Sequence, residues 1–389
     1  MKITRRVFAF LLVLCAPLVL FSSAQTSKKS AAKGQYLVYV GTYTTKTDSK
    51  GIYSFQFDAA TGKMTALRLA AESPDPSFVA VHPNGKYLYA VNEAGKNSMV
   101  SAFALDAQTG KLALLNQLPA LGEDPCYISF DRTGKYVFVA NYTSGNVVVF
   151  PIGADGKLGT ATANVHDEGK LGPNKERQDG PHAHWAQVST DNRFAFVADL
   201  GLDEILVYRL DSIKGTLTPN KPFFLRPLTA GAGPRHAAFS PDGRYFYVLS
   251  EMDSTVTTFA YAPDHGVFGY LGVVPMLPVG FEGRNDAAEI AVHSSGKFLY
   301  ASNRGHDSIA IFSIDPTKGT LTFGARVSTG GKEPRHFAID PSGNYLLAEN
   351  QLSNSVVVFK IDLAKGGLTP TGQVTEVPSP VDLTFVAAE

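Results

Sequence analysis

Six segments of the chain repeat one pattern: an apolar strand, a tight turn, and a second strand rich in aromatic residues. The clearest copies are GPRHAAFSPDGRYFYVLSE (233–251) and EPRHFAIDPSGNYLLAENQ (333–351). Turns such as Pro-Asp-Gly or Pro-Asn-Gly are strong signals for a β-hairpin. The copies start at residues 77, 126, 184, 235, 288 and 335, so successive starts lie 49, 58, 51, 53 and 47 residues apart. A period of this length indicates a repeat architecture.

Each hairpin is followed by a third alternating strand, such as GNVVVFPI (145–152), and by a turn of the type Asp-x-x-x-Gly that leads to a fourth strand. Four antiparallel strands in a unit of this length are typical of a β-propeller blade. The region 36–67 has three such strands and lacks an innermost one, whereas SPVDLTFV (379–386) is a strand without partners of its own. We predict that this last strand completes the first blade, which gives an all-β, seven-bladed propeller with four antiparallel strands per blade. Six blades with loose apolar ends would leave strand edges exposed, which favours the closed ring.

The N-terminus has the pattern of an export signal. Lys2, Arg5 and Arg6 precede the apolar stretch 7–21, and small residues follow it up to Ala24. The stretch is too short for a spanning helix. We expect residues 1–24 to be a signal peptide, 25–35 a flexible lead-in, and 36–389 one propeller domain in the periplasm or outside the cell. The order Thr-Arg-Arg-Val-Phe also fits a twin-arginine signal, and the general secretory route stays open.

The charge and cysteine content limit the possible partners. The formal net charge of zero gives no reason to expect binding to nucleic acid, or to a membrane once the signal is removed. Cys126 is the only cysteine beyond residue 24, so we expect no internal disulfide. We expect a monomer.

Two positions of the repeat should converge near the propeller axis, because the first strand of each blade lines the centre. The start of the first strand carries Ser77, Cys126, His184, Arg235, Ala288, Arg335 and Val381. The residue after the second strand is Glu93, Tyr142, Leu200, Glu251, Arg304 or Gln351. Core positions are alike among the blades and these two positions are not, as expected where a site is built on a repeated scaffold.

Polar residues at or beside these positions are the candidate site. The expected catalytic residues are His184, Arg235, Glu251 and Arg304, and the expected substrate-binding residues are His182, Glu93, His236, Arg335, His336 and Gln351. Structural roles are the alternative: arginines that tie blades together through backbone carbonyls, a glutamate that pairs with them, and a histidine in the channel wall. Because other blades carry Leu200 or Gln351 in place of the acid, we expect Glu251 to serve catalysis and not folding. The asparagines that recur just before this position are expected to favour turn geometry.

No metal and no cofactor are expected. His182 and His184 stand two residues apart and would share one face of a strand. However, no carboxylate cluster, His-x-x-x-His or Cys-x-x-Cys accompanies them.

The motifs GPHAH, GPRHAAFSPDGRYFYVLSE, ASNRGHDSIAIF and GKEPRHFAIDPSGNYLLAENQ resemble the seven-bladed lactonase family, which includes propeller-type 6-phosphogluconolactonases and a fungal carboxy-muconate lactonising enzyme. The resemblance extends over residues 36–386. It implies a metal-independent site of one histidine, two arginines and one glutamate. Matched motif by motif, these are His184 or His182, Arg235, Glu251 and Arg304.

The expected function is hydrolysis of a sugar-acid lactone, as in 6-phosphogluconolactonases, by general acid/base catalysis at the mouth of the channel. The arginines favour a small anionic substrate. Export points instead to an unphosphorylated lactone or to a lost activity. A non-catalytic binding module and a lactonising cycloisomerase are the alternatives, because the same side chains would serve either.

Overall fold

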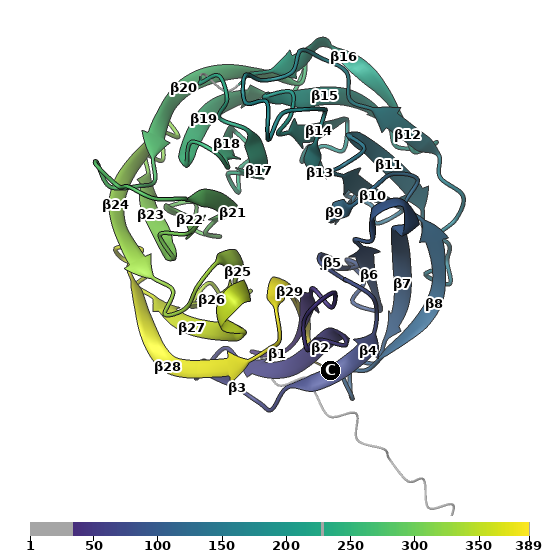
Figure 1. The fold of residues 1–389 in the computed structure, drawn as a ribbon, viewed down its shortest axis with the longest axis vertical. Coiled ribbons are helices and arrows are strands. Elements are labelled where there is room, and N and C mark those ends of the chain that lie inside the picture. Colours follow the sequence, from purple (N-terminus) through teal and green to yellow (C-terminus); the bar gives the residue numbers. More distant parts are fainter. Residues whose placement is uncertain (1–33, 227–228, 389) are drawn as a thin grey trace, which may run out of the picture. The chain divides into compact units, whose positions relative to one another are not determined.

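The computed structural model describes residues 34–226 and 229–388, which form a seven-bladed β-propeller (Figure 1). Seven antiparallel sheets stand around a common axis. In six of them, four consecutive strands of the chain follow one another from the innermost to the outermost position. The predicted signal peptide and most of the lead-in lie outside the described residues. The first strand begins at Gln35, one residue earlier than expected. Within the described ranges, no helix is long and apolar enough to span a membrane.

Six blades are built from consecutive strands. The second blade contains β5 (Val79–Val81), β6 (Tyr87–Asn92), β7 (Met99–Leu105) and β8 (Leu112–Pro119). The third contains β9 (Pro125–Phe130), β10 (Tyr136–Asn141), β11 (Asn146–Pro151) and β12 (Ala163–His166). The fourth contains β13 (Ala183–Val188), β14 (Phe194–Asp199), β15 (Glu204–Asp211) and β16 (Thr216–Leu225).

The remaining three of these blades follow the same order. The fifth contains β17 (Pro234–Phe239), β18 (Tyr245–Ser250), β19 (Thr255–Ala262) and β20 (Val267–Pro275). The sixth contains β21 (Asp286–Val292), β22 (Phe298–Arg304), β23 (Ser308–Ile314) and β24 (Leu321–Ser328). The seventh contains β25 (Pro334–Ile339), β26 (Tyr345–Asn350), β27 (Ser355–Ile361) and β28 (Leu368–Glu376). Two short 3₁₀ helices, η1 (Gly95–Asn97) and η2 (Gln351–Ser353), lie in connections.

The first blade joins the two ends of the described chain. The C-terminal strand β29 (Pro380–Ala387) pairs antiparallel with β1 (Gln35–Thr42), which in turn pairs with β2 (Gly51–Asp58). The outer strand is divided into β3 (Lys63–Met64) and β4 (Arg68–Glu72). Figure 1 shows β29 in the innermost position, between β25 and β5. The ring is therefore closed as the sequence predicted.

The hairpin turns explain the glycine of the repeat. Gly243 and Gly343, for example, adopt the left-handed conformation with φ of 71° and 74°, which a residue with a Cβ rarely adopts. In the fourth blade Asn192 takes this place with a φ of 60°. Asparagine is one of the few other residues that tolerate this conformation.

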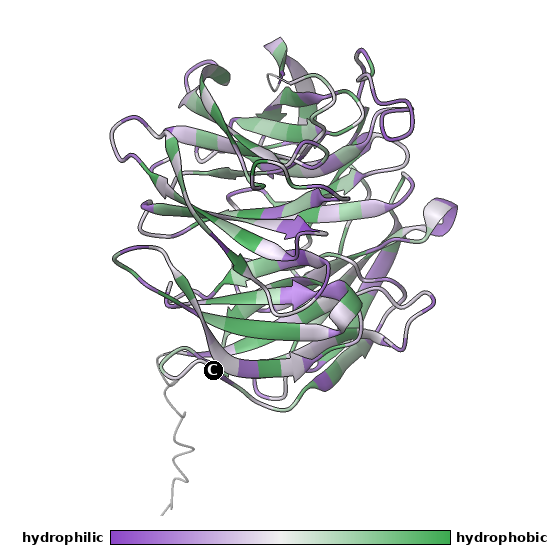
Figure 2. Cartoon of the chain, turned by 60° about the vertical axis from the view of Figure 1, so that its left-hand side comes forward, coloured by the Kyte–Doolittle hydropathy of each residue, from purple (hydrophilic) through white to green (hydrophobic). Residues whose placement is uncertain are grey.

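The aromatic residue that starts the second strand packs on the glycine of the next blade's Asp-x-x-x-Gly turn. A Cβ at Gly62 would lie 2.6 Å from Cε1 of Tyr345, so only glycine fits there. The same pairing repeats in Tyr136–Gly215, Tyr245–Gly319 and Phe298–Gly366. Tyr87–Gly156 and Phe194–Gly266 pack in the same way on turns that lack the aspartate of this motif. The pair Tyr345–Gly62 links the seventh blade to the first, so this contact closes the ring as well. Hydrophobic residues run along the strands, and hydrophilic residues gather in the connections (Figure 2).

The recurrent asparagines differ from the expectation. Asn92, Asn141 and Asn350 are the last residues of strands and none has a positive φ. Each is buried, and its side-chain amide donates to a backbone carbonyl that lies before the inner strand, for example Asn92 Nδ2 to Pro74 at 2.6 Å. These side chains satisfy buried backbone oxygens and tie the second strand to the connection that enters the blade.

Candidate active site

The inner strands are irregular at the position where the sequence placed the site. In five blades the residue at this position is skipped in the pairing with the second strand: Cys126, His184, Arg235, Arg335 and Val381. Such a β-bulge turns a side chain away from the regular alternation of the strand. Consecutive residues such as Arg235 and His236 can therefore both face other inner strands, which a regular strand would not allow.

Glu251 is the centre of the first group of side chains. It directly follows β18, and its carboxylate forms ion pairs with three guanidinium groups. Arg235 Nε on β17 lies 3.1 Å from Oε2, and Arg304 Nη2 at the end of β22 lies 3.2 Å from Oε1. The third partner is Arg177, whose Nη2 lies 2.6 Å from Oε1. Three of the four expected catalytic residues are thus brought into contact.

The charges of this group determine its protonation. Burial alone would raise the pKa of Glu251, but Arg304 and Arg235 hold that pKa well below its usual range. Burial and the neighbouring Arg304 lower the pKa of Arg235 to about 10, which keeps it charged near neutral pH. Glu251 is therefore an ionised carboxylate whose charge is balanced by buried arginines.

His184 is the histidine at the channel. Its Nδ1 lies 3.7 Å from Sγ of the buried, free Cys126, and within the described residues no hydrogen bond reaches its Nε2. Burial, and then the charge of Arg235, hold the pKa of His184 well below 6.5, so the ring is neutral near pH 7. His182 is engaged elsewhere: it stacks on Tyr142 with ring centroids 4.5 Å apart and bonds to Asp179 at 2.9 Å. The geometry therefore favours His184 over His182 as the reactive imidazole.

Arg335 and Glu93 form a second group, joined by a tyrosine that the sequence comparison of blades did not include. Tyr43 donates a hydrogen bond of 2.8 Å to Glu93 Oε2 and accepts one of 3.1 Å from Arg335 Nη2. Burial raises the pKa of Glu93, although the charge of Arg335 opposes this. A cavity of about 10 Å³ lies between this group and Arg235, which is about the room needed for one water molecule.

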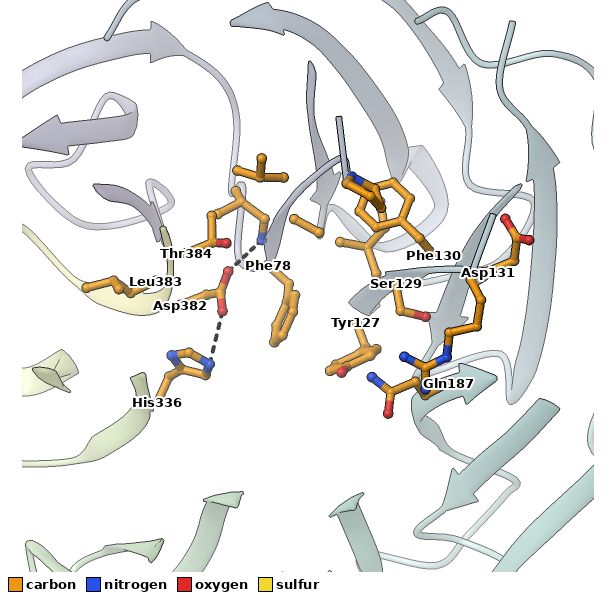
Figure 3. Close-up of a pocket in the computed structure, with 16 residues that line it drawn as sticks. Phe78, Tyr127, Ser129, Phe130, Asp131, Gln187, His336, Asp382, Leu383 and Thr384 are labelled. Carbon is orange, nitrogen blue, oxygen red and sulfur yellow. Dashed lines mark hydrogen bonds and ion pairs between the residues drawn. The ribbon is translucent and has the colours of Figure 1, made fainter. Parts of the chain in front are cut away.

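His236 and His336 belong to a third group, one residue further along the inner strands. Glu289 Oε2 lies 2.7 Å from His236 Nδ1 and 3.7 Å from His336 Nε2. The same His336 nitrogen lies 3.2 Å from Asp382 Oδ1, the pair joined by a dashed line in Figure 3. Burial is the main reason that the pKa values of Glu289 and Asp382 are each raised to about 7.

A cavity of about 420 Å³ lies beyond this third group. Figure 3 shows Phe78, which directly precedes β5, between His336 on one side and Tyr127 of β9 on the other; all three line this cavity. Its lining runs along the inner strands to Arg132 and Pro83 in the hairpin turns, so it opens on the face away from Glu251. Of the two expected substrate-binding histidines, only His336 lines this cavity. The ring of His236 lies 5.1 Å from that of His184, so His236 connects the third group with the residues around Glu251.

The third group leads to a prediction about stability and pH. An acid whose folded pKa is raised from 4.5 to about 7 holds a proton that the unfolded chain has released between these values. Its contribution to stability is therefore present below pH 4.5 and is lost as the pH rises through 7. The free energy of unfolding of Glu289→Gln, compared with that of wild type, should therefore rise by on the order of 2–3 kcal/mol when the pH is raised from 5 to 8. Urea unfolding at both pH values measures this difference.

The matched control for this experiment is Glu376→Gln, because Glu376 is exposed at the end of the outer strand β28. The difference between Glu376→Gln and wild type should not change with pH. A Glu289→Gln variant whose difference from wild type is equally constant would contradict the burial argument.

The structure also places residues that sequence reasoning missed. Arg177 lies in the connection 167–182. The sequence indicated this long connection only by the spacing of 58 residues between the starts of the third and fourth blades, the largest spacing among the repeats. Tyr43 follows β1 and would have appeared if the first unit had been aligned with the others. Among the expected residues, Gln351 starts η2, and within the described ranges no hydrogen bond or ion pair joins its side chain to the three groups.

The contacts of Glu251 change the expectation that folding does not need it. Comparison of the blades showed only that packing does not require an acid at this position. The structure shows that Glu251 balances two buried arginines and Arg177, so it has a structural role as well. Arg235 also bonds to the backbone carbonyl of Ala288 in the next blade, as the structural alternative expected. Arg304 bonds to the carbonyls of Asp286 and Ala287 within its own blade.

Comparison with known proteins gives one consistent result. A family model described as "Lactonase, 7-bladed beta-propeller" matches residues 37–385. A 6-phosphogluconolactonase of Bacillus subtilis is 38% identical over 303 residues, which cover 78% of this chain and 84% of that protein. A 6-phosphogluconolactonase of Formosa agariphila is 35% identical over 312 residues, with 77% and 85% covered. The solved structure of a periplasmic gluconolactonase of Pseudomonas aeruginosa is 35% identical with a TM-score of 0.86, and covers 91% of this chain and 100% of its own. The chain therefore belongs to the seven-bladed β-propeller lactonase family.

Proposed function

We propose that this protein hydrolyses a sugar-acid lactone at the group formed by His184, Arg235, Glu251 and Arg304. The observation that carries the proposal is a neutral histidine, His184, close to the charges of Glu251 and Arg235. Three arginines form ion pairs with Glu251 at the same place. Hydrolysis needs a proton acceptor for the attacking water and positive charge for the oxyanion that forms. The named relatives support this choice, because those of Bacillus subtilis and Formosa agariphila are called 6-phosphogluconolactonases.

In the proposed reaction, a water molecule attacks the carbonyl carbon of the lactone while His184 Nε2 accepts its proton. Arg235 and Arg304 stabilise the negative charge on the carbonyl oxygen. The ring C–O bond then breaks, and the imidazolium returns its proton to the leaving oxygen, which gives the open hydroxy acid. Glu251 remains ionised and stabilises the imidazolium while it exists. Glu251 is a weak base because its pKa is depressed, which is why His184 is assigned as the proton acceptor.

We also propose that the site needs no metal, because the arginines supply the positive charge. Among the described residues, no three His, Cys, Asp or Glu side chains are placed to hold a metal ion together. Export to the periplasm or the outside remains our proposal from the N-terminal pattern, and the periplasmic gluconolactonase of Pseudomonas aeruginosa supports it. We propose a monomer that binds a small lactone and no nucleic acid.

A lactone panel with and without chelator tests this function. We expect the purified protein to hydrolyse at least one sugar lactone, phosphorylated or not, and EDTA to leave the rate unchanged. His184→Asn should lower turnover by about 10²–10⁴ fold, the usual range for loss of a general acid or base. Proton release followed with a pH indicator measures the rate for each lactone, the effect of EDTA and the effect of His184→Asn. A loss of activity in EDTA that zinc or calcium restores would overturn metal independence, and a panel without turnover would favour a binding module.

A further inference from the structure

The connection 167–182 places one cation over the candidate site. It joins β12, which ends at His166, to β13, which begins at Ala183. The connection is held on the fourth blade: Gln178 Nε2 donates to the carbonyl of Leu200 and the amide of Gly172 to that of Gly201, both at 2.9 Å. Its Arg177 reaches Glu251 at 2.6 Å and Asp286 at 3.5 Å. Arg177 therefore stands between the buried carboxylate and the solvent.

Arg177 differs from the other two arginines of the site in its freedom to move. The side chains of Arg235 and Arg304 are 4% and 5% exposed, and both are bonded to backbone carbonyls of β21. The side chain of Arg177 is 37% exposed, and its ion pairs are with two carboxylates only. Of these three cations, Arg177 is the one that can turn toward a ligand without breaking a hydrogen bond to a backbone carbonyl, although it gives up its ion pairs with Glu251 and Asp286.

Both carboxylates stay paired when Arg177 turns away. Glu251 keeps Arg235 and Arg304, and Asp286 keeps Arg284, whose Nη2 lies 2.6 Å from it. The cost of releasing Arg177 is therefore small compared with the cost of leaving a buried charge alone. A guanidinium group offers a planar pair of donors that matches the oxygens of a carboxylate or a phosphate.

We propose that Arg177 is the residue that selects anionic substrates: it leaves Glu251 and binds the carboxylate or phosphate that the sugar lactone carries away from its reacting carbonyl. This inference rests on the proposed function for its substrate. It adds a consequence for the reaction, because removal of Arg177 from Glu251 strengthens the negative field at His184. An anionic ligand thus both binds and makes the proton acceptor more basic, whereas a neutral lactone leaves Arg177 on Glu251.

The first test measures binding and does not depend on turnover. Glucose 6-phosphate, glucuronate and glucose are titrated calorimetrically into wild type and Arg177→Gln. We expect wild type to bind at least one of the two anions more tightly than glucose, and the variant to bind that anion about 10- to 100-fold more weakly, as for a lost hydrogen bond to a charged group. Which anion responds decides between phosphate and carboxylate. Equal affinities of both proteins for both anions, or no preference of wild type for an anion, would overturn the proposal.

The second test compares lactones that differ in charge, in wild type, Arg177→Gln and Arg177→Lys. For anionic lactones, such as 6-phosphogluconolactone or a glucaric acid monolactone with its second carboxylate free, Arg177→Gln should raise KM by at least about 10-fold, with Arg177→Lys between it and wild type. For neutral gluconolactone at pH 6, Arg177→Gln should turn over faster than wild type. Without the positive charge of Arg177, the negative charge of Glu251 makes His184 a stronger base. Equal losses on neutral and anionic lactones would show a merely structural role and contradict the proposal.

The two tests separate this inference from the proposed function. A wild type that hydrolyses no lactone, yet binds an anion in a manner that depends on Arg177, would reject the lactonase and keep the anion selection. The matched control is Arg193→Gln, because Arg193 forms a half-exposed pair with Asp191 in the hairpin turn at the other end of β13. This variant should behave as wild type with every ligand.

Discussion

Removal of residues 379–389 should abolish cooperative folding of the protein. The deleted strand β29 supplies the inner strand of the first blade and carries the buried Val381 and Leu383. Asp382 Oδ2 also accepts a hydrogen bond of 2.7 Å from the amide of Val79 in the next blade. Without β29, the edge of β1 and the neighbouring inner strands would be exposed, which invites aggregation. Thermal and urea unfolding followed by circular dichroism would show no single sharp transition.

A shorter deletion provides the control for this experiment. Removal of residues 388 and 389 leaves β29 intact, and we expect this chain to unfold cooperatively near the temperature of the wild type. The added peptide SPVDLTFVAAE should restore part of the cooperative transition to the longer truncation, because it supplies the missing strand. An unchanged melting temperature after removal of residues 379–389 would show that the ring does not depend on its closure.

Glu251→Gln should remove both activity and stability. Glutamine cannot balance the two buried arginines, and breaking a buried ion pair by removal of one partner typically costs about 3–5 kcal/mol. Because Glu251 is proposed to stabilise the imidazolium of His184, we expect turnover to fall by about 10²–10⁴ fold. The exposed Glu72→Gln on β4 should leave both quantities unchanged. Urea unfolding and the lactone assay on the same preparations separate the two effects.

The pH gives a further check on the role of Glu251. Its folded pKa is depressed, so its contribution to stability is present above the pKa of about 4.5 in the unfolded chain and is lost as the pH falls below that value. The penalty of Glu251→Gln should therefore shrink as the pH falls below 4.5. A penalty that stays constant between pH 7 and pH 3 would be evidence against an ionised, charge-balancing glutamate.

The blade architecture was predictable from the sequence because its signals are local. The hairpin glycines with positive φ, the alternation along the strands and the Asp-x-x-x-Gly turn each act within a few residues. The aromatic residue and the glycine that pack together across neighbouring blades, such as Tyr345 and Gly62, repeat at a fixed spacing for the same reason. The incomplete first unit and the unpaired last strand then left closure by β29 as the solution without exposed edges.

The sequence also determined where a site could be built. Repeated strands that start at one face bring their first residues together, so Arg235, Glu251 and Arg304 were predictable as neighbours. His184 was expected beside them, and its ring lies in the same electrostatic environment. The order of blades around an axis is enough for this inference, because it does not require the direction of any single side chain.

Only the tertiary structure decided which of these side chains are in contact and in what protonation state they are held. Bulges in the inner strands divide the expected residues into three groups, and no alternation in the sequence reveals a skipped residue. The reach of Arg177 depends on how a long connection folds back over another blade. Burial and the balance of surrounding charges keep His184 neutral, keep Glu251 ionised and raise the pKa of Glu289 to about 7. These effects depend on distances between residues that are far apart along the chain, and such distances exist only after the ring has closed.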